Sequence, residues 1–377
     1  MKYVDLLKDL TLLPGVSGNE KHVRNYMERE LGGIADNVYR DKLGSIAFEF
    51  KTGNAGVSPA TTQNSKSRQD ACVPSIQTPN SELPKILVVA HLDEIGFMVH
   101  SVSSKGLINF INLGGWDART LMSSPVEIIN RDGDKIIGLI GSVPVHHLKD
   151  PSGKLTIDDM YIDIGAESAD EVKDLFKIRK GDFITPVPHF AFIEKKNIMI
   201  SKAFDDRVGV ALAIEIGKHF KENKHPNTIY CAGSVQEEVG TRGAQTIANL
   251  IKPDIAIVLE GSPGDDFPKN KDEIQAKLNG GVQIRLIDPT MLSNPDLVNF
   301  VIDIADELKI PYQLAVRKSG GTDAGKIHVS GIGVPTVVLA APVRYAHSHN
   351  GMLSLNDFQA TLDLTIAIIE RIDKFRG

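Results

Sequence analysis

The sequence predicts an α/β protein in which a mostly parallel sheet, flanked by helices, carries an inserted β-rich domain. Apolar runs of strand length alternate with helix-like segments through the second half of the chain, the pattern of a parallel sheet. Short strand candidates dominate the stretch after Val99 instead. Hydrophobic residues make up 42% and charged residues 24% of the 377 residues, which is typical of a soluble protein with a sizeable core.

The N-terminal segment is expected to form two helices followed by a strand. Leucines at helical spacing predict a first helix, which ends before Pro14. Ser17 and Glu20 have the spacing of a capping box and predict the start of the second helix. The segment 45–50 then predicts the strand.

Periodic hydrophobicity disappears between Gly53 and Leu83, where Ser, Thr, Asn, Gln, Pro and Gly dominate. A segment of this composition buries too little apolar surface to fold on its own. We therefore expect a flexible surface insertion at 53–83, with a functional lid as the alternative.

Continuous apolar runs follow this insertion, and they are typical of strands buried on both faces of a parallel sheet. Helix-like segments separate these runs and supply the expected flanking layers. The expected strands are 85–90, 229–235, 255–259, 282–287 and 336–339, and the expected helices are 208–220, 244–251, 295–308 and 356–375.

The middle of the chain has a different texture, with short strand candidates and one helix candidate at 169–176. An Arg-Asp-Gly-Asp turn at 131–134 joins two of these strands as a hairpin. We therefore predict an α/β domain in two parts, 1–98 and 196–377, and an inserted β-rich domain at 99–195. The strand candidates in the inserted domain are 108–112, 126–130, 135–140 and 160–164.

Charge and cysteine content exclude several classes of function. With 42 Lys and Arg against 48 Asp and Glu, the net charge of −6 argues against nucleic-acid binding. Cys72 and Cys231 lie far apart, which excludes a disulfide scaffold or a zinc ribbon and fits a reducing compartment. Neither a signal peptide nor an apolar run of about 20 residues is present. We expect a cytoplasmic protein with no membrane or nucleic-acid partner.

Carboxylates and imidazoles follow several of the expected strands, where open parallel sheets bind their ligands. Each of these residues also has a structural interpretation when it is considered alone. Paired acids favour helix starts, a Glu before a Gly suits a turn, and two neighbouring histidines compete near the C-terminus. The residues concerned are His91, Asp93, Asp205, Asp206, Glu237, Glu238, Glu260, His347 and His349.

Considered together, these side chains predict a metal site. Several clustered carboxylates cannot all stay ionised without a counter-charge, and a pair of divalent cations supplies one. Two imidazoles and several carboxylates without a thiolate favour a dinuclear zinc-type site, and cobalt or manganese suits similar ligands. One Asp can bridge two ions, and a spare Glu can take a proton from a bridging water whose pKa the metals lower to about 7.

The motifs of the chain resemble those of the tetrahedral (TET) family of dinuclear-metal aminopeptidases, which includes glutamyl and deblocking aminopeptidases. The resemblance covers nearly the whole chain except 53–83, and it implies a zinc-exopeptidase-like fold. The matching motifs occupy 14–20, 90–98, 203–207, 235–243, 320–324 and 344–348.

The resemblance also assigns roles to the candidate residues. Glu237 would be the general base that passes the proton of water to the leaving amine. Asp93 would orient His91, and Asp206 would shape the turn beside the bridging residue. His91, Asp205 and Glu260 would hold one metal, and Asp205, Glu238 and His347 the other, with Asp205 as the bridge.

The chain departs from the family pattern at one ligand. Many family members have Asp where this chain has Glu260, and the added methylene leaves the geometry and identity of that metal open. Asp265 or Asp266 is an alternative ligand. The segment 53–83 is a second departure, which could change access to the site or subunit packing.

The sequence therefore predicts a metal-dependent aminopeptidase that releases N-terminal residues from short peptides through a hydroxide bridging two divalent ions (zinc, or alternatively cobalt or manganese). The inserted domain is expected to support a homo-oligomer, and the resemblance implies a dodecamer. The alternatives are a related carboxypeptidase or N-acyl amino-acid deacylase, or a non-catalytic scaffold protein of the same fold. The sequence leaves the preferred N-terminal residue open.

Overall fold

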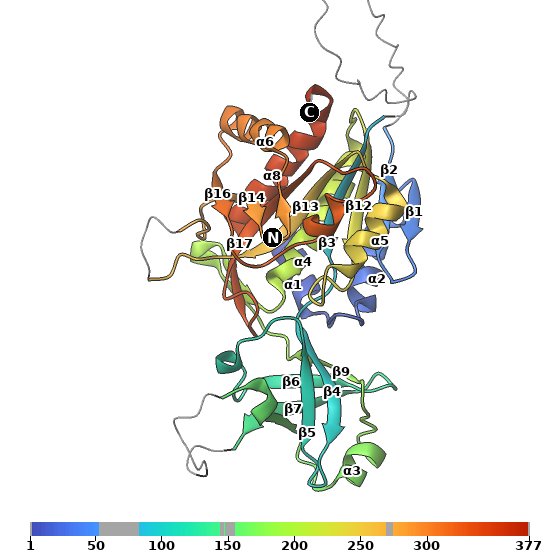
Figure 1. The fold of residues 1–377 in the computed structure, drawn as a ribbon, viewed down its shortest axis with the longest axis vertical. Helices are drawn as coiled ribbons and strands as arrows, with labels where there is room; N and C mark the ends of the chain where they lie inside the picture. Colours follow the sequence, from blue (N-terminus) through green and yellow to red (C-terminus); the bar gives the residue numbers. More distant parts are fainter. Residues whose placement is uncertain (1, 53–82, 144–146, 148–154, 269–273, 376–377) are drawn as a thin grey trace, which may run out of the picture.

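The computed structural model describes residues 2–52, 83–143, 147, 155–268 and 274–375 (Figure 1). Within these residues, one large mixed sheet with flanking helices forms an α/β domain, and a second, closed sheet forms a barrel. Figure 1 shows the barrel as a separate body below the α/β domain. The predicted α/β class with an inserted β-rich domain is confirmed. The predicted insertion at 53–83 and Cys72 lie outside the described residues, apart from Leu83.

The large sheet has a parallel centre, in which β12, β3, β13 and β17 are neighbours. Its other strand pairs are antiparallel, except for the parallel pair of β14 and β16. Its order is β1-β2-β12-β3-β13-β17-β18-β11-β10, and β14 joins β17 while pairing also with β15 and β16. The strands are β1 (Asn37–Arg40), β2 (Ile46–Phe50), β3 (Lys85–His91), β10 (Phe190–Ile193), β11 (Ile198–Ser201), β12 (Thr228–Ser234), β13 (Ile255–Pro263), β14 (Val282–Asp288), β15 (Met291–Leu292), β16 (Tyr312–Val316), β17 (Thr336–Arg344) and β18 (Gly351–Ser354).

Both faces of this sheet are buried, which explains why its central strands are apolar at successive positions. In β3, Ile86 and Val88 pack into one core, whereas Leu87 and Val89 pack into the other, as the alternation of side chains along a strand requires. Residues of α1, α2, α4, α6 and α8 fill the first core, and residues of α5 and α7 fill the second. The helices are α1 (Lys2–Leu12), α2 (Lys21–Leu31), α4 (Phe204–Glu222), α5 (Arg242–Ile251), α6 (Pro295–Leu308), α7 (Ala324–Ile327) and α8 (Leu355–Arg371).

The barrel has the order β4-β5-β8-β7-β6-β9, and closure leaves it without a free edge. Its core contains Phe97, Val99 and Phe110, with Phe97 against Phe110 at a centroid distance of 4.9 Å. The elements of this domain are β4 (Gly96–Val102), β5 (Ile108–Leu113), β6 (Pro125–Ile129), β7 (Lys135–Ser142), β8 (Met160–Asp163), α3 (Ala169–Asp174) and β9 (Phe183–Pro186).

The barrel differs at both edges from the range 99–195 expected for the inserted domain. Strand β4 begins at Gly96, because Phe97, two residues before Val99, already belongs to the barrel core. Strand β10, inside the expected range, pairs with β11 of the large sheet. The barrel strands thus run from Gly96 to Pro186, and the bounds of the inserted domain itself stay a prediction.

The prediction of a capping box at the start of α2 is wrong. Glu20 occupies the N-cap position but has helical dihedral angles and makes no side-chain cap. The hydroxyl of Ser17 instead donates to Oδ2 of Asp93 at 2.6 Å. The buried carboxylate competes for this hydroxyl, and so Ser17 serves the site rather than the helix.

None of the helices in the described part of the chain combines the length and the apolar character needed to cross a membrane.

Replacing Phe358 by alanine tests the packing of α8 against the sheet. Its side chain is fully buried and lies 5.2 Å from Tyr3, centroid to centroid, so Phe358→Ala should lower the free energy of unfolding by about 3–5 kcal/mol. The urea midpoint measures the loss. Phe267→Ala is the matched control, because Phe267 is 50% exposed, and equal losses in both variants would contradict this packing.

Candidate metal centre

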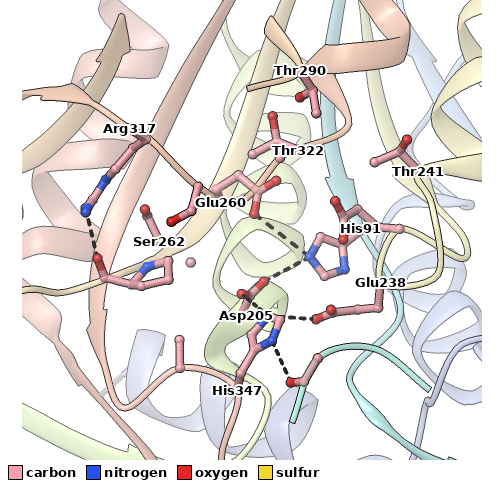
Figure 2. Close-up of a pocket in the computed structure, with 18 of the residues that line it drawn as sticks. His91, Asp205, Glu238, Thr241, Glu260, Ser262, Thr290, Arg317, Thr322 and His347 are labelled. Atoms are coloured by element: carbon pink, nitrogen blue, oxygen red, sulfur yellow. Dashed lines mark hydrogen bonds and ion pairs between the residues drawn. The ribbon is translucent and has the colours of Figure 1, made fainter. Parts of the chain in front are cut away.

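The strands β3, β12, β13 and β17, together with the start of α4, bring the predicted metal ligands to one cavity (Figure 2). The cavity has a volume of about 540 Å³. Asp93 does not line it and lies behind His91, fully buried. The predicted residues that line the cavity are His91, Asp205, Glu237, Glu238, Glu260 and His347.

Asp205 lies between the two imidazoles, with one carboxylate oxygen facing each. Its Oδ1 is 2.9 Å from Nε2 of His91, and its Oδ2 is 3.4 Å from Nε2 of His347. Glu238 completes the His347 side, with Oε1 3.5 Å from the same Nε2. On the other side, Oε2 of Glu260 is 3.9 Å from Nε2 of His91. The arrangement matches two groups of ligands that share Asp205 (Figure 2).

Both imidazoles are held by their other ring nitrogen. Nδ1 of His91 is 3.1 Å from the carbonyl oxygen of Asp93, and Nδ1 of His347 is 2.9 Å from that of Gly115. A carbonyl can only accept, so these contacts place a proton on Nδ1, and in the neutral imidazole the Nε2 lone pair is then directed into the cavity. This is the orientation that metal-binding histidines require.

Gly115 reaches His347 from the loop that follows β5 of the barrel. The loop approaches so closely that a Cβ at Gly114 would lie 2.5 Å from Ile95, and Gly114 has φ +83°. Glycine is required there for both reasons. The barrel therefore contributes to the position of a candidate ligand.

Asp93 connects the loops that carry the candidate ligands. Its carboxylate accepts from the backbone N–H groups of Glu237 at 2.9 Å and Glu238 at 3.1 Å, and from Ser17. Its Oδ1 also lies 3.5 Å from Nδ1 of His91. Burial opposes ionisation, but the hydrogen bonds from His91, Ser17 and Glu237 hold the pKa of Asp93 below its ordinary value.

The carboxylate of Asp206 is held by backbone N–H groups beside the candidate ligands. Both carboxylate oxygens of Asp206 accept from backbone N–H groups, those of Gly209 at 2.8 Å and His91 at 3.1 Å. Asp206 could also form a ligand group with His91 and Glu260, but we favour Asp205 because these two bonds already occupy Asp206. The two oxygens of Asp206 thus join α4 to β3.

The expectation that Glu260 follows the end of its strand is wrong. Strand β13 continues to Pro263, and Glu260 pairs within it with Ala340 of β17. The pairing with β17 continues through Gly261, Ser262 and Pro263, although this sequence resembles a turn. The alternative ligands lie elsewhere: Asp265 pairs with Arg317, Asp266 pairs with Arg344, and neither lines the cavity.

The side chains alone supply too little positive charge for this site. Burial raises the pKa of Glu238 to about 8, and burial with neighbouring carboxylates raises the pKa values of Glu237 and Glu260 well above the ordinary value. Burial opposes protonation of His347, yet Asp205 and Glu238 raise its pKa to about 10. A divalent cation that accepts nitrogen and oxygen ligands would supply the missing charge.

Behind the site, a buried ion cluster joins the barrel to the α/β domain. The carboxylate of Glu94 accepts from Nζ of Lys202 at 2.6 Å, Nη2 of Arg207 at 3.3 Å and the backbone N–H of Gly15 at 3.0 Å. Arg207 also donates to the carbonyl of Leu92 at 2.6 Å. These bonds fix the chain between His91 and the first barrel strand.

Three other residues, His349, Asp323 and Cys231, have structural positions. His349 packs beside Trp116 at a centroid distance of 5.3 Å and does not line the cavity. Asp323 occupies the N-cap position of α7, but its carboxylate accepts from Ser234 rather than capping the helix. Cys231 is buried in β12.

Sequence reasoning missed the wall of the cavity opposite the candidate ligands. Arg285, Arg317 and Thr290 line this wall, and of these Arg285 alone had a recognisable signal, as a charged residue inside an apolar strand. The contribution of Gly115 had none, because it uses a backbone carbonyl.

Comparison with known proteins connects this geometry to a family. The profile of the M42 glutamyl aminopeptidase family matches residues 73–364. The glutamyl aminopeptidase of Lactococcus lactis is 30% identical, with 99% of this chain and 97% of the relative covered. The lysyl aminopeptidase of Pyrococcus furiosus is also 30% identical, with 98% and 97% covered.

Solved structures support the same family assignment. A TET aminopeptidase from a marine sediment archaeon of the Thaumarchaeota has a TM-score of 0.88 and 36% identity, with 100% of this chain and 99% of that chain covered. The TET1 peptidase of Pyrococcus horikoshii, which can assemble into a tetrahedron or a large octahedral shell, has a TM-score of 0.80 and 28% identity, with 97% and 99% covered. The predicted family and zinc-exopeptidase-like fold are confirmed.

Adding Zn²⁺ or Co²⁺ to the chelator-treated protein should raise its melting temperature, because the cation neutralises buried carboxylates. A ligand at 100 times its Kd stabilises the folded state by about 2.7 kcal/mol. Asp205→Asn should lose most of this rise in a thermal denaturation assay. Asp357→Asn, a buried carboxylate outside the cavity, should keep it. An undiminished rise in Asp205→Asn would contradict the assignment.

Proposed function

The chain belongs to the M42 glutamyl aminopeptidase family and is a metal-dependent peptide hydrolase, and from this premise we propose that it is an aminopeptidase with a dinuclear metal centre. One observation carries the proposal: the two oxygens of Asp205 face two different Nε2 atoms, of His91 and of His347. Asp205 would bridge the ions, with His91 and Glu260 on one side and Glu238 and His347 on the other. Zinc fits this donor set, as do cobalt and manganese.

When bound, the two ions would lower the pKa of water to near neutrality and polarise the peptide carbonyl. Glu237 would move the proton. It lines the cavity beside Glu238, and its backbone is fixed by Asp93. Burial and neighbouring carboxylates raise the pKa of Glu237 while the ions are absent, and the charge of two bound cations would oppose this rise and favour the carboxylate form that accepts a proton.

Glu237 would act twice in each cycle. Its carboxylate takes a proton from the attacking water as the oxygen bonds to the carbonyl carbon. It then gives that proton to the amine nitrogen as the carbon–nitrogen bond breaks, which regenerates the carboxylate. Asp93 contributes by orientation, since it lies behind His91 and outside the cavity.

Short peptides with a free N-terminus are the proposed substrates, and a homo-oligomer is the proposed assembly. The TET1 relative can assemble into a tetrahedron or a large octahedral shell, and the barrel exposes Ile111, Ile137 and Leu139 to between 46% and 55%. We propose that the barrel domain contributes to subunit contacts, in a dodecamer as the resemblance implies. The cytoplasmic location remains a prediction from the sequence.

The role of Glu237 predicts a specific loss. Glu237→Gln keeps the shape of the side chain but cannot take a proton, so kcat should fall by about 10²–10⁴-fold. Release of the N-terminal residue from a short peptide measures kcat, and metal-induced thermal stabilisation should be retained. Glu370→Gln is the control, because Glu370 is exposed on α8.

The same assay should include the N-acetylated form of the peptide. The proposal expects cleavage of the free peptide alone. Cleavage of the acetylated peptide would favour a deacylase, and release of C-terminal residues a carboxypeptidase. Full activity in Glu237→Gln would contradict the assignment of the base.

A further inference from the structure

The cavity has a second charged end, opposite the candidate metal ligands. Two arginines line it: Arg285 on β14 and Arg317, which directly follows β16. Figure 2 shows Arg317 on the other side of the cavity from His91 and Glu238. The cavity thus extends from a carboxylate-rich end to a guanidinium-bearing end.

Each arginine is fixed from behind by an aspartate that does not line the cavity. Arg317 donates to Asp265 at 3.2 Å and to the carbonyl of Pro263 at 2.9 Å. Arg285 donates to Asp288 at 3.2 Å and to the hydroxyl of Ser262 at 2.9 Å. The guanidinium planes are therefore rigidly held, and the counter-charges lie outside the cavity wall.

The two aspartates are themselves engaged by backbone groups. Oδ1 of Asp265 accepts from the N–H of Ala276 at 2.9 Å, and Oδ1 of Asp288 accepts from the N–H of Thr290 at 2.8 Å. These bonds share the negative charge of each aspartate with its loop. The arginines are consequently less than fully neutralised by their partners.

Both arginines retain donor capacity. A guanidinium has five N–H groups, and the bonds to protein acceptors use the Nη atoms of each residue. The Nε atoms of both are buried and have no partner among the described residues, so the donors available to a bound anion are the remaining N–H groups of the Nη atoms. Burial lowers the pKa of Arg317, and the nearby charge of Arg285 lowers it further. Two close guanidinium groups at one cavity wall favour an anion.

We propose that Arg317 and Arg285 bind the side-chain carboxylate of the substrate's N-terminal residue, so that the enzyme prefers N-terminal Glu or Asp. This inference rests on the proposed aminopeptidase function. Family membership does not decide the preference, because a glutamyl and a lysyl aminopeptidase are each 30% identical to this chain. A lysine side chain would meet two like charges in this cavity, which disfavours it.

Isosteric substrates test the proposal on the unaltered protein. We would measure kcat/KM of the metal-loaded enzyme for p-nitroanilides of Glu, Gln, Leu and Lys. Glu and Gln differ in charge and hardly in shape, so the Glu substrate should be preferred over Gln by about tenfold or more. The Lys substrate should be the poorest of the four.

Arg317→Gln should reduce the Glu-to-Gln preference by about tenfold, since a hydrogen bond to a charged group contributes about this much discrimination. The kcat/KM for the Leu substrate should stay within about threefold, because this substrate has no carboxylate for Arg317 to bind. Arg179→Gln is the matched control, because Arg179 forms a comparable ion pair with Asp182 at 3.3 Å in the barrel domain. Cleavage of the Leu substrate by Arg317→Gln also shows that this variant folds. Competitive inhibition by L-glutamate, but not by L-glutamine, gives a second readout.

The outcomes separate the two proposals. Turnover of Leu or Lys substrates with a Glu-to-Gln ratio of one or less would overturn the carboxylate site and leave the aminopeptidase standing. A preference for Glu that survives both Arg317→Gln and Arg285→Gln would overturn the role of the arginines. Hydrolysis of none of the four substrates by the metal-loaded protein would overturn the proposed function itself.

Discussion

Negative charge concentrated at the carboxyl ends of the central strands is the constraint on which the rest of the site depends. Asp205, Asp206, Glu237, Glu238 and Glu260 surround His91 within a largely buried region. Such a group costs stability unless hydrogen bonds or cations compensate it. The observed compensation consists of backbone N–H groups directed at Asp93 and Asp206 and imidazoles directed at Asp205. The same charge is what makes the site suitable for divalent ions.

The inserted barrel helps to position the candidate ligands. Its loop supplies the Gly115 carbonyl that orients His347. Thr185 of β9 contacts the buried Glu94, with a distance of 3.4 Å between Oγ1 and Oε1. Glu94 in turn pairs with Lys202 and Arg207, which are anchored in the α/β domain. The positions of two candidate ligands on opposite sides of the site, His91 and His347, therefore depend on how the barrel sits against the sheet.

Much of this architecture could be predicted because it depends on local patterns. The bounds 295–308 predicted for α6 match the observed helix, since an Asn cap and a proline mark its start. The candidate ligands were recognisable because each follows or ends an apolar run. Glu260 was misplaced because the length of β13 is set by its partner β17, which is distant in sequence. Ser17 and Gly115 serve the site through single long-range bonds, and no local pattern encodes these.

The central claim is that Asp205 joins two ions in one site. The most direct measurement is the number of Zn²⁺ ions bound per chain, determined by elemental analysis after dialysis of the metal-loaded protein. The account predicts two ions in the natural protein and fewer than one in folded Asp205→Asn, because both ions lose a shared ligand. One ion per chain in the natural protein, or two in Asp205→Asn, would contradict it.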